Sequence, residues 1–207
     1  MKYQYITIER EFGSGGKEIG EKLAKELGIR CYDKELLAVA AKESGLCKEL
    51  FENHDEKPTN SFLYSLVMDT YSLGYTSSYS DMPINHKVFL AQFDAIKKLA
   101  ERESCVIIGR CADYALEDNP YAMSIYIKAD MDKRVKRIMT KYQLNESKAS
   151  DMIQKEDKRR ASYYNYYSSK KWGDAKSYDL CLDSGKLGVE GSIELIKDFI
   201  ALREKNF

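Results

Sequence analysis

The stretch TIEREFGSGGKEIGEKLAKELG, Thr7 to Gly28, decides the fold, because an apolar run, a glycine-rich turn and an amphipathic segment follow one another in it. Ile19, Leu23 and Leu27 recur every four residues, which places them on one face of a helix. Gly28 stands where a C-terminal helix cap belongs. The stretch therefore predicts a strand, a tight turn and a helix, the opening unit of an α/β domain.

The glycine turn has the layout of a phosphate-binding loop. The common ATP-binding pattern is G-x-x-x-x-G-K-[ST], but Glu11 holds the first glycine position here and Glu18 holds the Ser/Thr position. Backbone N–H groups and a helix N-terminus still converge on one point, where Lys17 can reach a β- or γ-phosphate. The cradle is predicted to comprise Gly13, Ser14, Gly15, Gly16, Lys17 and Glu18. The alternative is a structural turn with a solvated lysine.

Glu18 bears on how a metal ion is handled. A carboxylate at this position can hold Mg²⁺ directly or through water, whereas the usual hydroxyl is missing. We therefore expect a Mg²⁺ ion held mostly by water and substrate oxygens, and no metal site built by the protein itself.

Short apolar runs alternate with longer periodic segments along the rest of the chain, as in a parallel sheet covered by helices. The strands are expected at Tyr3 to Glu9, Ile29 to Asp33, Ser104 to Gly109, Met123 to Ala129 and Tyr178 to Asp183. The main helices are expected at Lys17 to Leu27, Lys87 to Arg102 and Ser192 to Glu204.

Two segments interrupt this alternation. Asn53 to His86 is polar, rich in tyrosine and contains two of the three prolines, so it is interpreted as an insertion of short helices and loops. Asn145 to Trp172 is a charged helix running into RRASYYNYYSSKKW. No linker separates a second domain, and residues 1–207 are predicted to form one.

Composition limits the choice of partners. The 33 basic and 33 acidic residues cancel, so no global charge favours nucleic acid or an anionic membrane. No apolar run is long enough for a membrane span, and we expect a cytoplasmic protein. The five cysteines are widely spaced, which favours reduced, buried thiols over disulfides. The sequence leaves the oligomeric state open.

Five segments in order resemble nucleoside monophosphate kinases, and most closely the cytidylate-kinase-like family. They are EREFGSGGKEIGEKLAKELG, CYDKELL, VIIGRCADYAL, IYIKADMDKRVKRI and DKRRASYYNYYSSKKWGDAKSYDLCLDS. The resemblance implies a three-layer P-loop NTPase fold with a five-stranded parallel sheet, and ATP and Mg²⁺ as cofactors. It also implies a monophosphate-binding insertion at about 53–86 and a mobile lid within about 145–172.

The resemblance assigns roles to individual residues. Lys17 matches the lysine of the phosphate cradle, and Arg159 and Arg160 match the basic lid motif that closes over the transferring phosphate. Arg110 matches the arginine of the family's Gly-Arg-Asp motif, which faces the acceptor nucleotide. Cys111 replaces the aspartate of that motif, and Asp113 is the candidate to take over its role.

The family's usual acceptor-site residues after Asp33 are also changed, to Lys34, Glu35, Ala38 and Val39. Asp33 either orients an arginine or a metal-bound water at the acceptor site, or caps the helix that follows it. CMP as the acceptor therefore needs evidence beyond the resemblance.

Several charged and aromatic residues have two interpretations. Arg134 and Arg137 either join the phosphate site or lie on a solvated helix face. Asp157 either fixes a lid arginine or forms a surface ion pair. The tyrosines near the end of the charged helix either stack on a base or pack the helix against the domain, and packing is favoured. They are Tyr163, Tyr164, Tyr166 and Tyr167.

Phosphoryl transfer requires positioning and positive charge around the transferred group, which is consistent with several arginines near a glycine loop. The sequence thus predicts an ATP-dependent kinase that phosphorylates a nucleoside monophosphate similar to CMP or dCMP. The alternatives are a nucleotide-binding sensor or regulatory protein without turnover, or a kinase of another small molecule.

Overall fold

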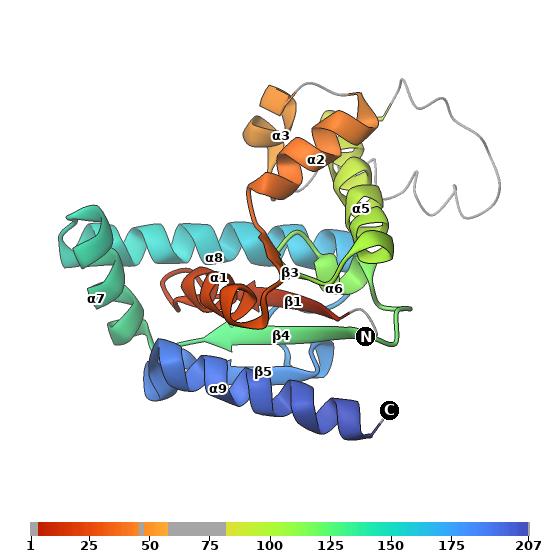
Figure 1. Ribbon diagram of the computed structural model, residues 1–207. Coiled ribbons are helices and arrows are strands. Elements are labelled where there is room, and N and C mark those ends of the chain that lie inside the picture. The colour runs from red at the N-terminus through yellow and green to blue at the C-terminus, as the bar shows by residue number, and fades with distance from the viewer. Residues whose placement is uncertain (1–3, 46–47, 58–81, 207) are drawn as a thin grey trace.

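A computed structural model describes residues 4–45, 48–57 and 82–206. Five parallel strands form one sheet in the order β2-β3-β1-β4-β5 (Figure 1). They are β1 (Tyr5–Arg10), β2 (Arg30–Tyr32), β3 (Cys105–Ile108), β4 (Ala122–Lys128) and β5 (Leu180–Asp183). The predicted α/β class with a five-stranded parallel sheet is confirmed, and each predicted strand lies within two residues of an observed boundary.

Strand β1 lies at the centre of the sheet, paired with β3 on one side and β4 on the other. Its side chains alternate between two cores, since Ile6 and Ile8 point to one face and Tyr5 to the other. A strand buried on both faces needs helices on both sides. The glycine loop that follows β1 therefore emerges at the middle of the sheet's carboxyl edge.

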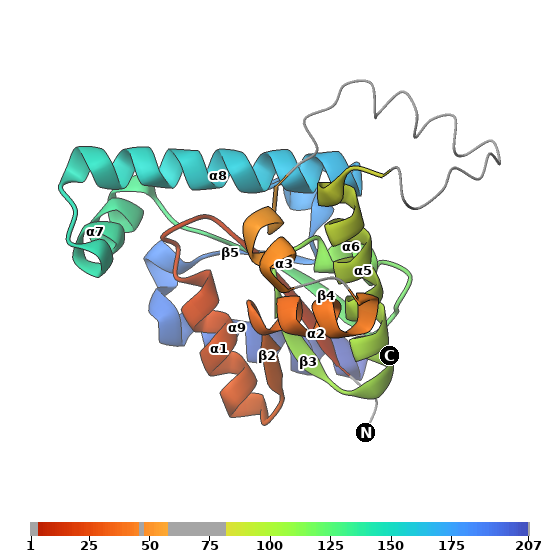
Figure 2. The same ribbon diagram turned by 90° about the horizontal axis from the view of Figure 1, so that it is seen from above.

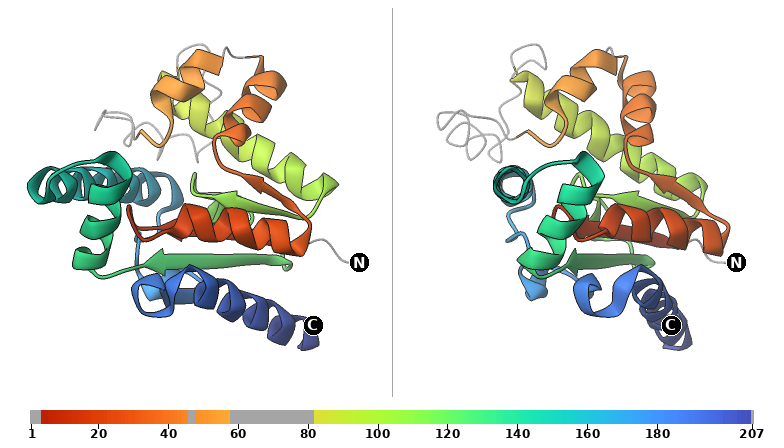
Figure 3. Two further views of the ribbon diagram at one scale, coloured as in Figure 1. Left: turned by 60° about the vertical axis from the view of Figure 1, so that its left-hand side comes forward. Right: turned by 90° about the vertical axis from the view of Figure 1, so that its left-hand side faces the viewer.

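Helices α1 (Gly16–Leu27) and α9 (Ser184–Lys205) cover one face, where Ile19 and Leu23 meet Ile193 and Ile196. The other face is covered by α2 (Glu35–Ser44), α3 (Lys48–His54), α5 (Ile84–Arg102) and the short α6 (Ala112–Ala115). Figure 3 shows α9 on the opposite side of the molecule from α2, α3 and α5. The result is a three-layer arrangement.

Helix α9 begins earlier than predicted, at Ser184, because the side chain of Asp183 caps its first turn by accepting from Gly185 N. Gly188 interrupts the helix with a φ of 69°, which explains why the periodic pattern becomes clear only from Ser192 onward.

Helix α8 (Glu146–Ser168) follows α7 (Met131–Tyr142) and is continuous over 23 residues. Figure 2 shows it running along one side of the molecule. Tyr163 and Tyr167 are buried against Phe89 of α5, which stacks on Tyr167 at 4.0 Å between ring centroids, and Tyr164 is buried against Asp113 and Tyr178. The packing interpretation of these tyrosines is confirmed. The predicted lid segment is thus mostly regular helix.

The insertion predicted at 53–86 falls largely outside the described residues, which omit 58–81. Its described ends are the last turn of α3, residues 55–57 and the start of α5.

Among the cysteines, Cys105 and Cys111 are buried and Cys31 is half-buried, all as free thiols. The expectation of burial is wrong for Cys181, which is exposed because β5 is an edge strand. Cys47 lies outside the described residues. None of the described helices is long and apolar enough to cross a membrane.

Gly16 tests how tightly the glycine loop is packed onto β1. A Cβ at this position would lie 2.5 Å from Arg10 Cβ, although alanine favours helix formation. We expect Gly16→Ala to lower the free energy of unfolding by about 1–3 kcal/mol in urea titrations. Gly191→Ala is the control, because its nearest contact would be an ordinary 3.6 Å and it should stabilise the protein by up to about 1 kcal/mol. Equal effects of the two changes would contradict the packing argument.

Candidate active site at the phosphate loop

The loop between β1 and α1 has the backbone form of an anion cradle. Gly13 and Gly15 have φ values of 84° and 85°, which L-residues with side chains rarely adopt. Gly15 immediately precedes α1, so the positive end of that helix faces the loop. Among the described residues, no backbone carbonyl accepts a hydrogen bond from the N–H groups of Gly13, Gly15 or Lys17. These groups are available to an anion.

Ser14 has hydrogen-bond partners both inside and outside the loop. Ser14 Oγ donates to Glu11 O at 2.9 Å and accepts from Gly16 N at 3.3 Å. Ser184 Oγ, at the start of α9, donates to Ser14 O at 2.6 Å. Ser14 therefore shapes the loop through its side chain.

The loop is tied to three other elements by carboxylates. Asp157 on α8 accepts from Phe12 N at 2.7 Å and from the guanidinium of Arg134 on α7. Glu11, at the position where the common motif has glycine, accepts from Ala129 N at 2.9 Å, just after β4. Glu11 thus acts as an anchor, and Asp157 holds both a loop N–H and an arginine of α7. Neither earlier interpretation of Asp157 included the loop.

A cleft of about 1000 Å³ opens above the loop. It is lined by the loop, by the carboxyl ends of the strands, by α7 and by the middle of α8. Of the residues predicted for the site, it contains Gly13, Gly15, Gly16, Lys17, Glu18, Asp33, Arg110, Arg159 and Arg160. The tertiary structure brings these positions together from β1, β2, β3 and α8, as expected at the edge of a parallel sheet.

Lys17 and Arg110 share a carboxylate. Lys17 Nζ lies 2.6 Å from Asp33 Oδ2, and Arg110 Nη1 lies 3.2 Å from Asp33 Oδ1. Hydrogen bonding to Asp33 raises the pKa of Lys17. Burial opposes ionisation of Asp33, but Lys17 and Arg110 outweigh it and lower its pKa. Asp33 therefore orients two cations, and α2 forms without a side-chain cap.

Arg110 is held by Asp55 as well, through Nε at 2.9 Å and Nη2 at 2.7 Å. Its remaining contact is Nη1 to Ile108 O at 3.1 Å. Arg110 is thus bonded through all three nitrogens and is buried. Gly109, Arg110 and Cys111 all have positive φ, which directs the arginine into the cleft while Cys111 packs into the tyrosine cluster.

The two arginines of α8 are placed differently. Arg159 pairs with Glu156 at 2.7 Å and donates to Asp55 O at 2.9 Å. Arg160 donates from Nη1 to Arg10 O at 3.0 Å and lies under Phe12. Both approach Glu56, a buried carboxylate that also contacts Arg10.

The helix α7 contributes two further arginines. Arg134 is buried and donates to Phe12 O at 3.3 Å. Arg137 lies over the loop, where its Nη1 is 2.9 Å from the position a Cβ on Gly15 would take. These placements exclude a purely solvated face for the two side chains.

Glu18 is paired with two cations. Its carboxylate lies 2.8 Å from Arg137 Nη1 and 3.3 Å from Lys22 Nζ. Burial opposes ionisation of Glu18, but Lys22 and Arg137 lower its pKa overall. Among the described side chains, no group of three or more His, Cys, Asp or Glu residues is arranged to hold a metal ion.

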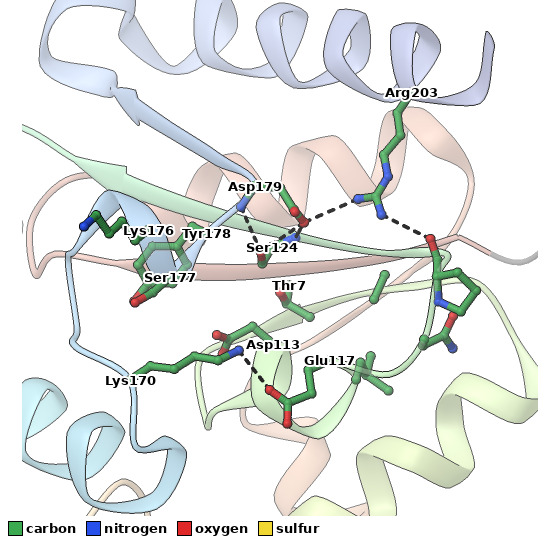
Figure 4. Close-up of a pocket in the computed structure, with 14 residues that line it drawn as sticks. Thr7, Asp113, Glu117, Ser124, Lys170, Lys176, Ser177, Tyr178, Asp179 and Arg203 are labelled. Carbon is green, nitrogen blue, oxygen red and sulfur yellow. Dashed lines mark hydrogen bonds and ion pairs between the residues drawn. The ribbon is translucent and has the colours of Figure 1, made fainter. Parts of the chain in front are cut away.

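Asp113 lies away from the cleft. It lines a second pocket of about 290 Å³, with Thr7, Ser124 and Tyr178 (Figure 4). Its Oδ2 accepts from Tyr164 OH at 2.5 Å, and burial raises its pKa. Four of the pocket's other charged residues form two ion pairs, Lys170 with Glu117 at 3.1 Å and Arg203 with Asp179 at 3.3 Å. The structure therefore does not bring Asp113 to the base-side position expected for it, because α6 turns its side chain toward α8.

The site contains residues that the sequence did not reveal, chiefly Arg10, Asp55 and Glu56. Asp55 and Glu56 follow α3 in a segment with no periodic pattern, and they meet the arginines only through long-range contacts. Arg10 and the neighbouring Glu9 offered a signal, because two charges at the end of an apolar strand need partners when buried.

Comparison with protein families identifies the chain's relatives. The cytidylate kinase-like family matches residues 5–186, and the chain belongs to that family. No curated protein matches the chain.

Solved structures agree on the fold. A crystal structure of an uncharacterized protein from Eubacterium ventriosum is 33% identical with a TM-score of 0.71, covering 96% of this chain and 98% of that one. Shikimate kinase from Bacteroides thetaiotaomicron is 15% identical with a TM-score of 0.54, covering 96% and 98%. Shikimate kinase from Acinetobacter baumannii, in complex with shikimate, is 10% identical with a TM-score of 0.50, covering 96% and 93%. The chain has the fold of P-loop kinases.

Asp157 tests the anchoring of the loop. Asp157→Asn removes the charge that holds Arg134 and weakens the bond to Phe12 N, so we expect unfolding to become easier by about 1–3 kcal/mol in urea titrations. The control is Asp151→Asn, an exposed position on the same helix, which should change stability by less than about 0.5 kcal/mol. Similar values for both variants would show that the Asp157 contacts do not anchor the loop.

Glu9 predicts a pH dependence of stability. Burial raises its pKa to about 7, although Arg10 and the N–H of Trp172, 3.1 Å away, favour the charged form. The folded state therefore keeps a proton that the unfolded state has lost. This contribution to stability is complete below the unfolded pKa of about 4.3 and is lost as pH rises through about 7.

We expect the difference in unfolding free energy between wild type and Glu9→Gln to change between about pH 5 and pH 8. Wild type should become less stable relative to Glu9→Gln as pH rises. Chemical denaturation at a series of pH values measures it. A difference that stays constant across this range would contradict the shifted pKa.

Proposed function

We propose that this protein transfers the γ-phosphate of ATP to a small acceptor. The observation that carries the proposal is the convergence of free loop N–H groups, Lys17, Arg159 and Arg160 on one cleft. The cradle would bind the β- and γ-phosphates through Gly13 to Lys17, with the N-terminus of α1 contributing its positive end. The family supports the same assignment.

The residues would act by position and charge. Lys17 would exchange Asp33 for a phosphate oxygen, which is possible because its side chain is half exposed. Arg159 and Arg160 would neutralise charge on the oxygens of the transferred group. Closure of α8 over the cleft would exclude water and so limit hydrolysis of ATP. Mg²⁺ that enters with ATP would be held mostly by water and phosphate oxygens, since Glu18 is paired with Arg137 and Lys22.

The first acceptor class is a nucleoside monophosphate, CMP or dCMP, as expected for this family. Arg110 would face the acceptor, and Asp33 would orient it. An acceptor phosphate at Arg110 would compete with Asp33 and Asp55, because these carboxylates and Ile108 O already accept hydrogen bonds from Nε, Nη1 and Nη2.

That same observation favours a second candidate, a kinase of a neutral polyhydroxylated molecule. Asp33 and Asp55 line the cleft beside Lys17 and present carboxylate oxygens that accept hydrogen bonds from hydroxyl groups. Such an acceptor would leave the pairs with Arg110 intact. A sensor that binds nucleotide without turnover remains the non-catalytic alternative.

A coupled assay of ADP release tests the proposal with CMP, dCMP, UMP, AMP and neutral hydroxyl acceptors such as glycerol. We expect turnover with at least one of them and a fall in kcat/KM of roughly 10²–10³-fold in Lys17→Ala, because a preorganised positive charge is lost. Lys25→Ala, exposed on the same helix, should match wild type.

Preference for CMP over the hydroxyl acceptors supports the first class, and the reverse preference supports the second. If calorimetry shows that ATP binds but turnover does not exceed that of Lys17→Ala, the protein is a nucleotide-binding sensor and not a kinase. Failure to bind any nucleotide would contradict both.

A further inference from the structure

Three arginines surround the carboxylate of Glu56 at the centre of the cleft wall. Glu56 Oε1 lies 3.2 Å from Nη1 of Arg10, at the end of β1. Glu56 Oε2 lies 3.6 Å from Nη2 of Arg159 and 3.7 Å from Nε of Arg160, both on α8. Only the contact with Arg10 is short enough for a hydrogen bond. One oxygen of Glu56 is therefore held firmly, while the other is approached by two guanidinium groups without being bonded.

The cluster has unused hydrogen-bonding capacity. Arg160 Nε is buried and donates to no acceptor among the described residues. Burial, followed by repulsion from Arg10, lowers the pKa of Arg160 to about 10, so its positive charge is incompletely compensated. A buried donor without a partner is costly, which indicates a site that suits a larger anion than one carboxylate.

Glu56 itself is held in an uncommon backbone conformation. Its φ is 50°, in the left-handed region, directly after Asp55. The side chain is 6% exposed, although the residue lies in the short segment that follows α3. Burial opposes its ionisation, but Arg10, Arg160 and Arg110 outweigh it and lower its pKa strongly. Glu56 is thus a charged carboxylate placed among the arginines by the fold.

We propose that Arg10, Arg159 and Arg160 form a binding site for a phosphoryl group, and that Glu56 fills this site until a phosphoryl group replaces it. This inference rests on the proposed function and adds Arg10 to the residues that contact the transferred group. A phosphoryl group offers three terminal oxygens in place of two, so each guanidinium gains an oxygen at hydrogen-bond distance. Glu56 is a positioning residue that keeps the arginines together in the absence of ligand.

The exchange is electrostatically balanced. Removing Glu56 alone would leave the buried Arg160 without its anion and Arg10 with only Glu9, 3.6 Å away, which is unfavourable. Replacement of one anion by another avoids that cost. All four side chains line the cleft, so the displaced Glu56 carboxylate can move into the open space of the cleft.

The test is calorimetric titration of the nucleotide-free protein with inorganic phosphate. Glu56→Gln keeps the shape of the side chain and removes the competing charge, so we expect phosphate to bind at least about 10-fold more tightly than to wild type, equivalent to about 1.4 kcal/mol. Glu49→Gln is the matched control, because it changes the net charge equally from an exposed position on α3. Its affinity for phosphate should stay within about twofold of wild type.

Adding Arg159→Gln to Glu56→Gln should abolish the gain, which locates the phosphate at the three arginines. Equal phosphate affinity in Glu56→Gln and Glu49→Gln would overturn the proposal. If circular dichroism shows that Glu56→Gln does not fold, amide hydrogen exchange of the wild-type protein tests the displacement instead. Phosphate should then speed the exchange of the amides of residues 55–57. Unchanged or slower exchange there would count against displacement.

The outcomes separate this proposal from the proposed function. An absence of turnover with every acceptor, together with tighter phosphate binding by Glu56→Gln, contradicts kinase activity and leaves the phosphoryl site standing. An active enzyme in which Glu56→Gln leaves phosphate affinity unchanged contradicts only the role of Glu56.

Discussion

Charge compensation at the carboxyl edge of the sheet is the constraint on which the rest of the structure depends. Lys17 and Arg110 share Asp33, Arg110 also holds Asp55, and Arg10 holds Glu56. Most of these groups are buried, and a buried charge without a partner would destabilise the fold. Carboxylates from β2 and from the segment after α3 are therefore as necessary to the cleft as its cations.

This compensation has a consequence for ligand binding. Any phosphate that enters the cleft competes with carboxylates already bound to the same cations. The site therefore exchanges anions, and the affinity for a ligand is a difference between two sets of ion pairs. A hydroxyl acceptor meets no such competition at Asp33 and Asp55. The preferred acceptor class therefore depends on which ion pairs break when the acceptor binds.

Helix α8 links the parts of the site. Asp157 holds the glycine loop, Arg159 and Arg160 reach Glu56 two and three residues later, and the tyrosines of its last turns pack on α5. A movement of this helix would shift loop anchor and arginines together. The helix is packed at both ends, since its tyrosines lie in the cluster with Phe89, and Ala149 and Ile153 pack on Val135 and Ile138 of α7.

Local pattern was sufficient to predict the strands, the glycine loop and the helix from Gly16, because hydrophobic periodicity and glycine positions act over a few residues. Lys17 came from the loop pattern, whereas the family resemblance supplied Asp33, Arg110, Arg159 and Arg160, and all five line one cleft. Neither source identified Asp55 or Glu56, which carry no pattern of their own, and Asp113 was misplaced. Asp113 lies on α6 and is held by Tyr164 of α8, a long-range contact that depends on how the two helices pack.

The sequence by itself thus determined the fold class, the phosphate loop and, through the family resemblance, the cations Arg110, Arg159 and Arg160, but not Arg10. Only the tertiary structure decided which carboxylate each cation meets, that Glu11 and Asp157 anchor the loop, and that Glu18 is paired with Arg137. The physical reason is that partners in these pairs are far apart along the chain. Their distances follow from how helices pack on both faces of the sheet, which no local pattern records.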